Sequence, residues 1–449
     1  MHEVLASVVI PVWRDADALT RTLHRLPGRS NADVIVACVL GEEPRYQGAR
    51  ARYPDVRWVS APRGRASQMN AGAAIAGGRW LLFLHADSEL PIDWVSVIAQ
   101  ADQRAHVVAG AFRLALDSPD WQARLVEFGV RLRVALFGLP YGDQALCIRR
   151  DAFEAMGGYR DLPLMEDVDL VRRVKEEGRL QRFHSVVRTS ARRWKREGWM
   201  RRSLRNVSLA TRYLCGSSPA RLAQQYFGRH AEAVVLMARA PWTGGKTRLA
   251  VPVDDAGHAD LRRALFLDTL DVLTAYAGVE HIIACEPPEA CEQMRELAGP
   301  AVDVIAQRGA DLGQRIKCVF EDVMRLGVES MVVVGSDLPD LPSRLLRRAF
   351  DALRGQQDHV VLGPATDGGY YLIGMNRLHA ALFEQIDWST DRVLAQTLGA
   401  AKAQRLPIVM LEPWADVDNA TDLRRLRDLP ESATAPRTRA WGLAHLARD

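Results

Sequence analysis

The sequence predicts an α/β protein of two domains, each a mostly parallel sheet flanked by helices. Short apolar segments alternate with segments of helical periodicity, which is the pattern of strand–helix–strand units. The apolar segments are continuous rather than alternating, as in strands that are covered on both faces. This pattern begins at residue 6 and begins again at residue 233, and we place the domains at residues 1–229 and 230–449.

The first half opens with ASVVIPV, a buried-type strand from Ala6, which the helical segment at residues 15–26 follows. Three more runs rich in β-branched and apolar residues indicate strands; they are residues 32–40, 56–62 and 79–87. Residues 66–78, ASQMNAGAAIAGG, indicate a helix of small residues that ends on glycines.

The second half repeats this alternation. Strand-like segments begin at Ala233 and cover residues 280–287 and 330–337. Helical periodicity covers residues 259–276 and 312–327. No stretch rich in Pro and Ser separates the halves, so we expect the two domains to abut near residues 221–232.

Composition narrows the class of protein. With 48% hydrophobic and 25% charged residues in 449, the chain is typical of globular proteins. It has no apolar run of membrane-spanning length, and we expect no signal peptide. Its six cysteines form no CxxC pair, which favours reduced thiols in the cytoplasm. Residues 1–229 carry a net charge of +11 and residues 230–449 a net charge of −7, so anionic partners are expected for the first half.

Each half contains an apolar strand that runs into an aspartate. LLFLHADSELP, residues 81–91, leads to Asp87, and MVVVGSDLPDLP, residues 331–342, leads to Asp337. Ligands bind beyond the carboxyl ends of strands in open α/β sheets. A carboxylate there can hold Mg²⁺ or Mn²⁺ against the phosphates of a nucleotide. The alternative is that both aspartates are helix N-caps.

The motifs GRASQMN, PYGDQ, LMEDVDL and SARRW follow one another in the first half. In this order they resemble a family 2 glycosyltransferase of the GT-A fold, in a subgroup found beside radical-SAM and arsenosugar genes. The resemblance implies inverting, metal-dependent transfer from a nucleotide sugar. It implies nucleotide contacts at Pro11, Val12, Asp15, Arg65 and Asn70, a metal at Asp87 with His85 in the first D-x-D position, acceptor contacts at Asp143 and Gln144, catalysis at Glu166 and Asp167, and diphosphate contacts at Arg192, Arg193 and Trp194.

The general base is assigned to Asp167. An inverting displacement needs one carboxylate that takes the proton of the acceptor. LMEDVDLVRRV has the pattern of a helix start, whose N-terminus would keep Asp167 ionised. The alternative is that Glu166, Asp167 and Asp169 are ordinary acids of a first helical turn.

Two features of the first half leave alternatives open. The segment from Arg188 to Arg212 is basic with Glu197 as its one acid, and it is either a membrane-surface helix or a solvated face over the active site; no RNA-binding motif accompanies it. The aspartate that usually contacts the base is missing at Ala37 and Cys38. Either Glu42 or Glu43 replaces it, or nucleotide preference and activity are altered.

In the second half, APWTGGKT at residues 240–247 follows a strand and fits a relaxed phosphate-loop pattern. A phosphate loop must lead into a helix, but Pro252 and its β-branched neighbours would break one. We therefore disfavour a P-loop ATPase.

The ordered motifs ARAPWTGGKTRL, GADLGQRI, VVVGSDLPDLP, GPATDGGYYLIGM and DVDNATDL instead resemble DUF2064, a GT-A-like family related to 2-phospholactate guanylyltransferase. The resemblance implies a triphosphate clamp, a metal site and a second-substrate turn, and Arg239 stands where this family has a lysine. The implied residues are Lys246 and Arg248 for the clamp, Asp337 and Asp418 for the metal, Asp367, Gly368 and Gly369 for the turn, and Asp311 and Arg315 as further substrate contacts. The alternative for TDGG is a simple turn.

These inferences combine into a cytoplasmic, bifunctional transferase that acts on nucleotide sugars and nucleoside triphosphates and not on nucleic acid. The first domain transfers a sugar, and the second transfers a nucleotidyl group or a second sugar, in biosynthesis of the arsenosugar type. Two alternatives remain: one domain, with the first as the better candidate, is a non-catalytic nucleotide-binding scaffold, or the first domain is a membrane-surface lipid glycosyltransferase docked through residues 188–212.

Overall fold

The structure is a computed structural model of the chain. It describes residues 4–28, 32–228, 230–244, 251, 253–354, 358–428 and 435–446. The chain forms two compact units, Met1–Ala223 and Gln224–Asp449, which are described separately below. The division falls within α10 (Pro219–Phe227).

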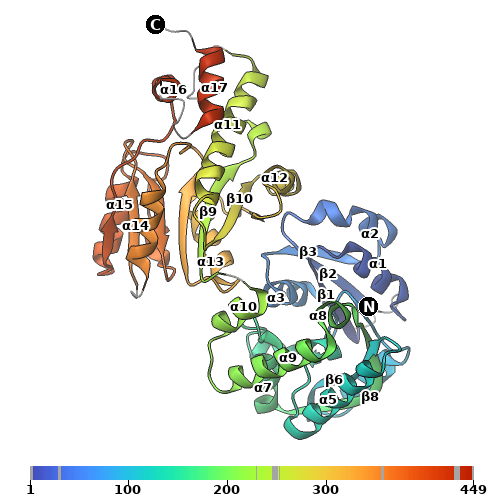
Figure 1. The fold of residues 1–449 in the computed structure, drawn as a ribbon. Helices are drawn as coiled ribbons and strands as arrows, with labels where there is room; N and C mark the ends of the chain where they lie inside the picture. Colours follow the sequence, from blue (N-terminus) through green and yellow to red (C-terminus); the bar gives the residue numbers. More distant parts are fainter. Residues whose placement is uncertain are drawn as a thin grey trace. The chain divides into compact units, whose positions relative to one another are not determined.

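The first unit is built on an eight-stranded sheet in the order β3-β2-β1-β4-β7-β6-β8-β5 (Figure 1). The strands are β1 (Ala6–Val12), β2 (Asp33–Val39), β3 (Arg57–Ala61), β4 (Trp80–Phe83), β5 (Ser88–Glu89), β6 (Val107–Asp117), β7 (Cys147–Arg149) and β8 (Arg179–Ser190). The other helices are α1 (Ala16–Arg25), α2 (Gln47–Arg52), α3 (Arg65–Ile75), α4 (Trp94–Asp102), α5 (Trp121–Phe137), α6 (Arg150–Ala155), α7 (Glu166–Glu177), α8 (Arg192–Glu197) and α9 (Trp199–Leu214).

The second unit is built on a seven-stranded sheet in the order β11-β10-β9-β12-β14-β13-β15. The strands are β9 (Glu232–Arg239), β10 (Glu280–Glu286), β11 (Asp303–Ala306), β12 (Ser330–Gly335), β13 (Val360–Pro364), β14 (Tyr370–Met375) and β15 (Ile408–Met410). The helices are α11 (Asp255–Thr274), α12 (Cys291–Ala298), α13 (Leu312–Met324), α14 (Ser343–Leu353), α15 (Val393–Ala403), α16 (Ala420–Arg427) and α17 (Pro436–His445).

The two sheets share one topology over seven strands. In each, the first four strands are parallel, the next two pairings are antiparallel, and the last pairing is parallel again. By this correspondence β4 is equivalent to β12, and β8 is equivalent to β15. The two strands that lead to Asp87 and Asp337 therefore hold the same position in their sheets.

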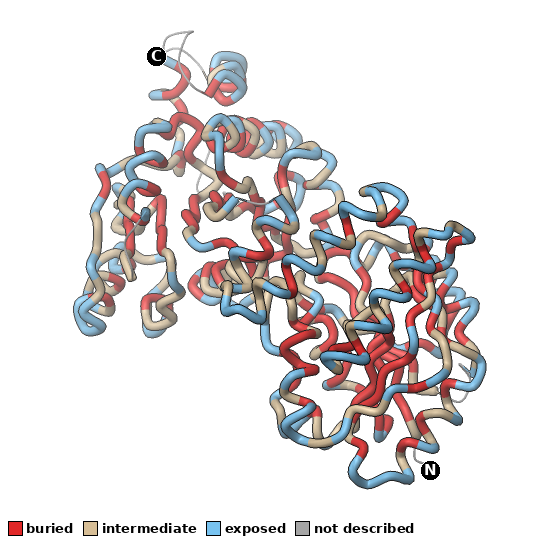
Figure 2. The backbone as a smooth tube through the Cα atoms, turned by 60° about the horizontal axis from the view of Figure 1, so that its bottom comes forward, coloured by how far each residue is buried: buried red, intermediate tan, exposed pale blue. Residues whose placement is uncertain are grey.

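The predicted fold class, two mostly parallel sheets flanked by helices, is confirmed. The strands form the buried centre of each unit (Figure 2). Val8, Val9 and Ile10 are all fully buried although successive side chains face opposite sides of the sheet, so both faces of β1 are covered. Within the described ranges, no helix combines the length and apolar character that crossing a membrane requires.

Candidate functional site

Neither Asp87 nor Asp337 caps a helix, so the alternative assignment for these aspartates is wrong. The helix after Asp87 begins only at Trp94, with Asp93 in the N-cap position. The helix after Asp337 begins at Ser343 and follows Pro342. Both aspartates instead belong to the turns that leave β4 and β12 at their carboxyl ends.

The segment after the last parallel strand lies beside each aspartate. The backbone N–H of Ser190, at the end of β8, donates to the carbonyl oxygen of Asp87 at 3.2 Å. The backbone N–H of Val417, after β15, donates to the carbonyl oxygen of Asp337 at 3.0 Å. The same hydrogen bond thus recurs at equivalent places, and residues that flank Ser190 or Val417 join the respective site.

In the first unit this segment brings Arg192 to the site. The Arg192 guanidinium pairs with the carboxylate of Asp15, which is also the N-cap of α1. The pKa of Arg192 is raised mainly by its hydrogen bond to Asp15, and the charge of Asp87 adds to the effect. Three residues assigned from sequence to the nucleotide and metal, Asp15, Asp87 and Arg192, therefore converge.

Asp167 lies across a glycine turn from His85. One carboxylate oxygen of Asp167 accepts from the backbone N–H of Gly142 at 2.7 Å, and the other accepts from that of Val168 at 2.8 Å. A Cβ atom on residue 142 would lie 3.2 Å from His85 Nε2 and 3.4 Å from Asp167 Oδ2. Only a residue without a side chain lets the turn fit closely between the imidazole and the carboxylate.

The imidazole of His85 is neutral. Burial lowers its pKa, and the charges of Arg65 and Arg193 lower it further. Its Nε2 atom is buried and has no hydrogen-bond partner within the described part of the protein. A neutral ring nitrogen of this kind can accept a hydrogen bond or ligate a metal.

The other two acids at the start of α7 are held by arginines. Glu166 is 4% exposed and lies 3.2 Å from Arg65. Burial raises the pKa of Glu166, and the charge of Arg65 opposes this rise. Asp169 pairs with Arg160 at 3.1 Å and with Arg173 at 2.9 Å. The Glu166 carboxylate is thus engaged with Arg65, and its assignment to catalysis stays a prediction.

Gln144 also has a role that differs from its sequence assignment. Its side chain is 4% exposed, donates to the carbonyl of Phe112 at 2.9 Å and accepts from the backbone N–H of Tyr141 at 3.3 Å. It fixes the turn rather than facing an acceptor. Asp143 fits an acceptor contact better, because one of its oxygens is buried without a hydrogen-bond partner in the described residues. Burial raises the pKa of Asp143, and the charge of Asp167 contributes.

Two further residues assigned from sequence to the nucleotide, Asn70 and Trp194, make contacts within the protein. The amide of Asn70 bonds twice to the backbone of Tyr159, at 2.8 and 2.9 Å, and so holds that loop. Trp194 is 9% exposed and packs in a cluster with Leu114 and Leu116. In both cases a residue type common in binding motifs stabilises the unit instead.

The base-binding end of the site is organised by Gln68, which sequence reasoning missed. Its amide donates to the carbonyl of Val12 at 2.8 Å and to that of Ala37 at 2.7 Å, and so joins the ends of β1 and β2. Pro11 is paired in register with Ala37. A buried glutamine within a helix of small residues has no periodic signal, and its partners are distant in sequence.

Neither proposed substitute for the missing base-contact aspartate is a spare carboxylate. Glu42 is 2% exposed and accepts from Arg14 and Arg45, both at 3.1 Å. Glu43 accepts from the backbone N–H of Gly41 at 2.7 Å and from the hydroxyl of Ser60. Both side chains organise the loop after β2.

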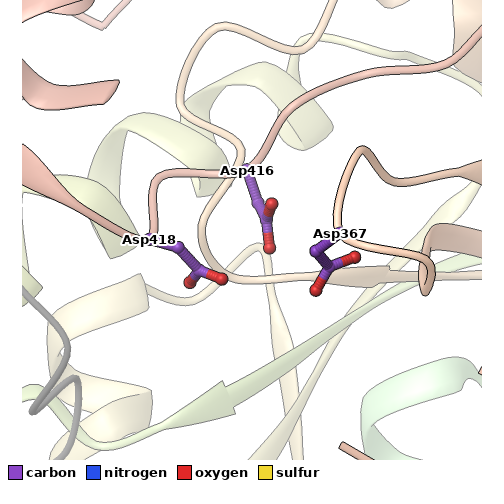
Figure 3. A group of neighbouring side chains, drawn as sticks. All are labelled: Asp367, Asp416 and Asp418. Carbon is purple, nitrogen blue, oxygen red and sulfur yellow. The ribbon is translucent and has the colours of Figure 1, made fainter. Parts of the chain in front are cut away.

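In the second unit, three aspartates form an acidic cluster. Asp367 comes from the turn between β13 and β14, and Asp416 and Asp418 come from the segment after β15 (Figure 3). One oxygen of each carboxylate lies within 4.8 Å of the others. Asp367 was assigned from sequence to a second substrate, but it lies with the metal candidates. Asp416 was missed, although the spacing of Asp416 and Asp418 is that of a D-x-D motif.

Carboxylate crowding is strongest at Asp416. Burial raises the pKa of this group to about 6, and the charges of Asp418, Asp367 and Asp337 raise it as well. Together with the Val417 hydrogen bond, this places Asp337 beside the cluster. Asp418 belongs to the cluster and Asp337 lies near it, while their joint role at a metal stays a prediction.

The turn that carries Asp337 is held by Thr269 of α11. The Thr269 hydroxyl donates to the carbonyl of Ser336 at 3.1 Å and accepts from the backbone N–H of Leu338 at 3.2 Å. These two bonds clamp the residues on either side of Asp337. The position of this carboxylate therefore depends on a helix that is distant in sequence.

The glycines of the TDGG segment form a turn. Gly368 has φ +90°, and a Cβ atom there would lie 2.2 Å from the carbonyl oxygen of Asp391. The close backbone approach at Gly368 is therefore to the backbone of Asp391, and the assignment of this turn to a second substrate stays a prediction. The backbone N–H of Gly369 donates to Asp367 at 2.9 Å and orients that carboxylate toward the cluster.

Cationic residues gather at the carboxyl ends of β9 and β10. Arg239 and Arg315 share the carboxylate of Glu286, with closest distances of 3.1 and 2.5 Å. Asp311 caps α13 by accepting from the backbone N–H of Gln314 at 2.8 Å. The other two cations assigned to the triphosphate clamp, Lys246 and Arg248, lie outside the described residues.

The donor sets of the two units differ in their fit to a divalent cation. The three clustered carboxylates of the second unit, with Asp337 nearby, are hard oxygen ligands that suit Mg²⁺ or Mn²⁺, and crowding of negative charge favours a cation among them. The first unit offers Asp87 and the unpartnered, neutral nitrogen of His85, a pair that suits Mn²⁺ better than Mg²⁺.

Comparisons with known proteins divide the chain in the same way. Residues 7–157 match the family described as Glycosyl transferase family 2, and residues 269–390 match the family described as Uncharacterized protein conserved in bacteria (DUF2064). None of the curated proteins compared with the chain matches it. Two different families in the two halves support a fusion of two domains.

Two solved structures are similar to parts of the chain. One is a protein assigned as a nucleotide-diphospho-sugar transferase from Desulfovibrio desulfuricans G20, with 28% identity, 48% of this chain and 96% of that chain covered, and a TM-score of 0.44. The other is residues 1–349 of S. aureus TarS in complex with UDP-GlcNAc, with 11% identity, 41% and 58% covered, and a TM-score of 0.33.

Proposed function

We propose that the first unit transfers a sugar from a nucleoside-diphosphate sugar to an acceptor, with inversion. The proposal rests on two groups of neighbouring residues. Asp167 and His85 both lie against Gly142. Asp15 and Asp87 both lie near Arg192. The match of residues 7–157 to a glycosyl transferase family supports the reaction class.

In this mechanism Asp167 takes the proton of the acceptor hydroxyl. The N–H groups of Gly142 and Val168 each donate to one oxygen of its carboxylate and hold it in place. Arg192, with its orientation set by Asp15, contributes positive charge toward the departing diphosphate. A divalent cation held by Asp87, with help from His85, would supply further neutralisation of that charge.

For the second unit we infer nucleotidyl transfer from a nucleoside triphosphate to a phosphorylated or otherwise anionic small molecule. The clustered carboxylates of Asp367, Asp416 and Asp418 can hold the cation that accompanies a triphosphate, and Arg239 and Arg315 provide positive charge at the ends of β9 and β10. If the second unit instead transfers a sugar, the same carboxylates and arginines would bind its nucleotide-sugar donor. A fusion of this kind suggests consecutive steps, in which the second unit makes the donor that the first consumes.

The test is a mass-spectrometric screen of nucleotide sugars, and of triphosphates paired with sugar phosphates, on the full-length protein. Asp167→Asn should strongly slow sugar transfer and leave pyrophosphate release intact. Asp418→Asn should do the reverse. A chain that releases no pyrophosphate across the panel would contradict nucleotidyl transfer without affecting the proposal for the first unit.

A non-catalytic first unit is the alternative that the loop after β2 favours, because both nearby glutamates are bonded within the protein. Titration with UDP and GDP, with and without Mn²⁺, separates the two proposals. A scaffold would bind nucleotide equally well with Asp87→Ala and without metal.

All six cysteines are unpaired, which supports our proposal that the protein acts in the cytoplasm.

A further inference from the structure

Helix α5 presents an apolar stripe to solvent. The stripe recurs every three or four residues, which is the spacing of one helical face. Its side chains are 48% to 70% exposed, and they are Trp121, Leu125, Phe128, Leu132 and Leu136. Isolated exposed apolar residues are normal in globular proteins, but a continuous stripe marks a surface that binds something.

Helix α9 packs against α5 and has a second stripe of the same kind (Figure 1). Met200, Leu204, Val207 and Leu214 are 46% to 64% exposed and again lie three, four or seven residues apart. Of the seventeen large apolar side chains that are exposed in the described part of the chain, ten belong to these two helices. The concentration is therefore local and not a general property of the surface.

The opposite faces of these helices are also apolar and are already covered. Ala123 is buried, and Val126, Val130 and Trp199 pack with it around Trp194. Helix α5 is therefore apolar on two faces, one against the protein and one against solvent. A helix with this pattern is stable where a second apolar medium covers its outer face.

The charged side chains of these helices indicate which apolar medium covers the stripes. The acid of α5, Glu127, is 7% exposed and bonded to Arg124 and to the backbone of Leu116. The acid of α8 and α9, Glu197, is paired with Arg202 and with Arg205. The acid at the N-cap of α5, Asp120, is paired with Lys195. Exposed cations accompany the stripes, and they are Arg124, Arg131, Lys195, Arg196 and Arg201. Arg124 and Arg196 pair with Glu127 and Glu197, so cations outnumber acids along the stripes.

An apolar stripe with a cationic margin, in which Asp120, Glu127 and Glu197 are all paired with cations, matches a lipid surface that carries anionic headgroups. A second copy of the same surface is a poorer match, because a symmetric contact would set the cations of one copy against those of the other. We propose that α5 and α9 dock this protein on an anionic membrane surface, with the apolar stripes in the headgroup region.

This docking would act on the candidate active site, because α5 leads directly into the turn beside Asp167. Arg133 of α5 donates to the carbonyl of Leu139 at 3.1 Å, and its guanidinium lies 3.4 Å from the centre of the Tyr141 ring. The acceptor side of the proposed glycosyltransferase site thus adjoins the docked helices. This last point depends on the proposed function, whereas the docking itself does not.

The test is flotation of the full-length protein with vesicles. The wild type should float with vesicles of phosphatidylcholine and phosphatidylglycerol and much less with phosphatidylcholine alone. Leu132→Gln and Leu204→Gln should each weaken binding roughly tenfold. Ile92→Gln is the matched control, because Ile92 is 87% exposed and lies outside both helices; its binding should equal that of the wild type.

The cationic margin is tested separately. Arg131→Gln and Arg201→Gln should each weaken binding to the anionic vesicles by about fivefold at low salt. Arg347→Gln, an exposed arginine of α14 in the second unit, should leave binding unchanged. These substitutions are all at exposed positions, and circular dichroism would verify that each variant is folded.

Three outcomes would overturn the proposal. The first is a wild type that does not float with anionic vesicles. The second is equal binding by the stripe variants and the Ile92 control. The third is a dimer by light scattering that Leu132→Gln dissociates, together with no flotation, because the stripe would then be an interface between two copies or with another protein.

Discussion

Asp416 should make metal binding by the second unit depend on pH. Burial and three neighbouring carboxylates raise its pKa to about 6. At pH 5 about one Asp416 in ten is then ionised, whereas at pH 7.5 almost all are. Because a cation binds the carboxylate form, the apparent Kd for Mn²⁺ should rise about tenfold between pH 7.5 and pH 5 through this group alone.

The substitution that isolates this effect is Asp416→Asn. Asparagine keeps the size of the side chain but removes the titrating group, so the variant should bind Mn²⁺ more weakly at pH 7.5 and lose most of the change toward pH 5. Calorimetric titration of the full chain measures both quantities. Carrying Asp87→Asn in all samples removes the candidate metal ligand of the first unit from the comparison.

Stability of the metal-free protein should change in the opposite direction. The pKa of Asp416 is raised from 3.8 in the unfolded chain to about 6, so the group destabilises the fold above pH 4, and the effect is complete above pH 6. A shift of about two pKa units corresponds to ~3 kcal/mol, which solvent screening of this half-buried group reduces to ~1–2 kcal/mol. Metal-free Asp416→Asn should therefore be more stable than the wild type at pH 7.5 and equal to it near pH 4.

The reasoning fails if wild-type affinity is the same at both pH values, or if Asp416→Asn keeps the full pH dependence. Either result would mean that Asp416 is not crowded by the other carboxylates in solution. Asp340→Asn is unsuitable as a control, because Asp340 holds Trp414 and Arg425 and so supports the same segment.

Three further predictions concern single residues. Asp167→Asn should lower kcat for sugar transfer by about 10²–10⁴-fold, measured as initial rates, and an unchanged kcat would rule out Asp167 as the proton acceptor. Asn70→Ala should lower the free energy of unfolding by ~1–2 kcal/mol through the lost bonds to Tyr159, with KM for the nucleotide sugar unchanged. Gly368→Ala should destabilise the second unit by ~1–3 kcal/mol in urea unfolding, because its Cβ atom would meet the carbonyl of Asp391; wild-type stability would contradict the turn geometry.

The sheets were predictable because burial of a strand on both faces leaves a continuous apolar run. The run from Val8 to Ile10 shows this, since all of it is fully buried. The strand ends were predicted too late, because β4 ends at Phe83 and β12 at Gly335, so Asp87 and Asp337 lie in the turns beyond the strands and not at their last residues. The strand β15 was not predicted, because its three residues are too few to form a pattern. Asp416, which follows this strand, was missed for the same reason.

The side-chain assignments were less predictable, because a motif does not say which way a polar or aromatic group points. Asn70, Gln144 and Trp194 all lie in motifs that suggest ligand contacts. Each side chain instead satisfies a backbone group or packs in the core. The partners, such as the carbonyl of Phe112, are far away in sequence and become neighbours only in the folded sheet.

The exposure of α5 could not have been predicted from sequence either. A helix whose apolar residues recur with helical spacing is normally expected to bury that face against its own domain. In α5 the buried contact is made by the opposite face, through Ala123 and Val134, while Leu125 and Leu132 remain exposed. Which of two apolar faces meets the sheet is decided by tertiary packing.

The repeated strand-then-aspartate pattern has a common geometric cause and two different chemical outcomes. In each unit the carbonyl of the aspartate accepts from the segment after the last parallel strand. In the second unit that donor, Val417, has an aspartate on either side, so the segment itself adds two carboxylates to Asp337. In the first unit the donor, Ser190, lies between Thr189 and Ala191, and the next charged group is the cation Arg192.

It follows that the two sites should differ in how they acquire a cation. The second unit holds enough carboxylates to bind Mn²⁺ before any nucleotide arrives. The first unit has one carboxylate opposite an arginine, so the oxygens of a bound diphosphate must complete the coordination of a cation there. We therefore expect Mn²⁺ to bind at Asp87 only when a nucleoside diphosphate is present. Asp87→Asn should weaken Mn²⁺ binding under that condition and have no effect without the diphosphate. Both units have a strand that leads to an aspartate because they share one sheet topology. The residues beside the aspartate then decide whether the metal or the nucleotide binds first.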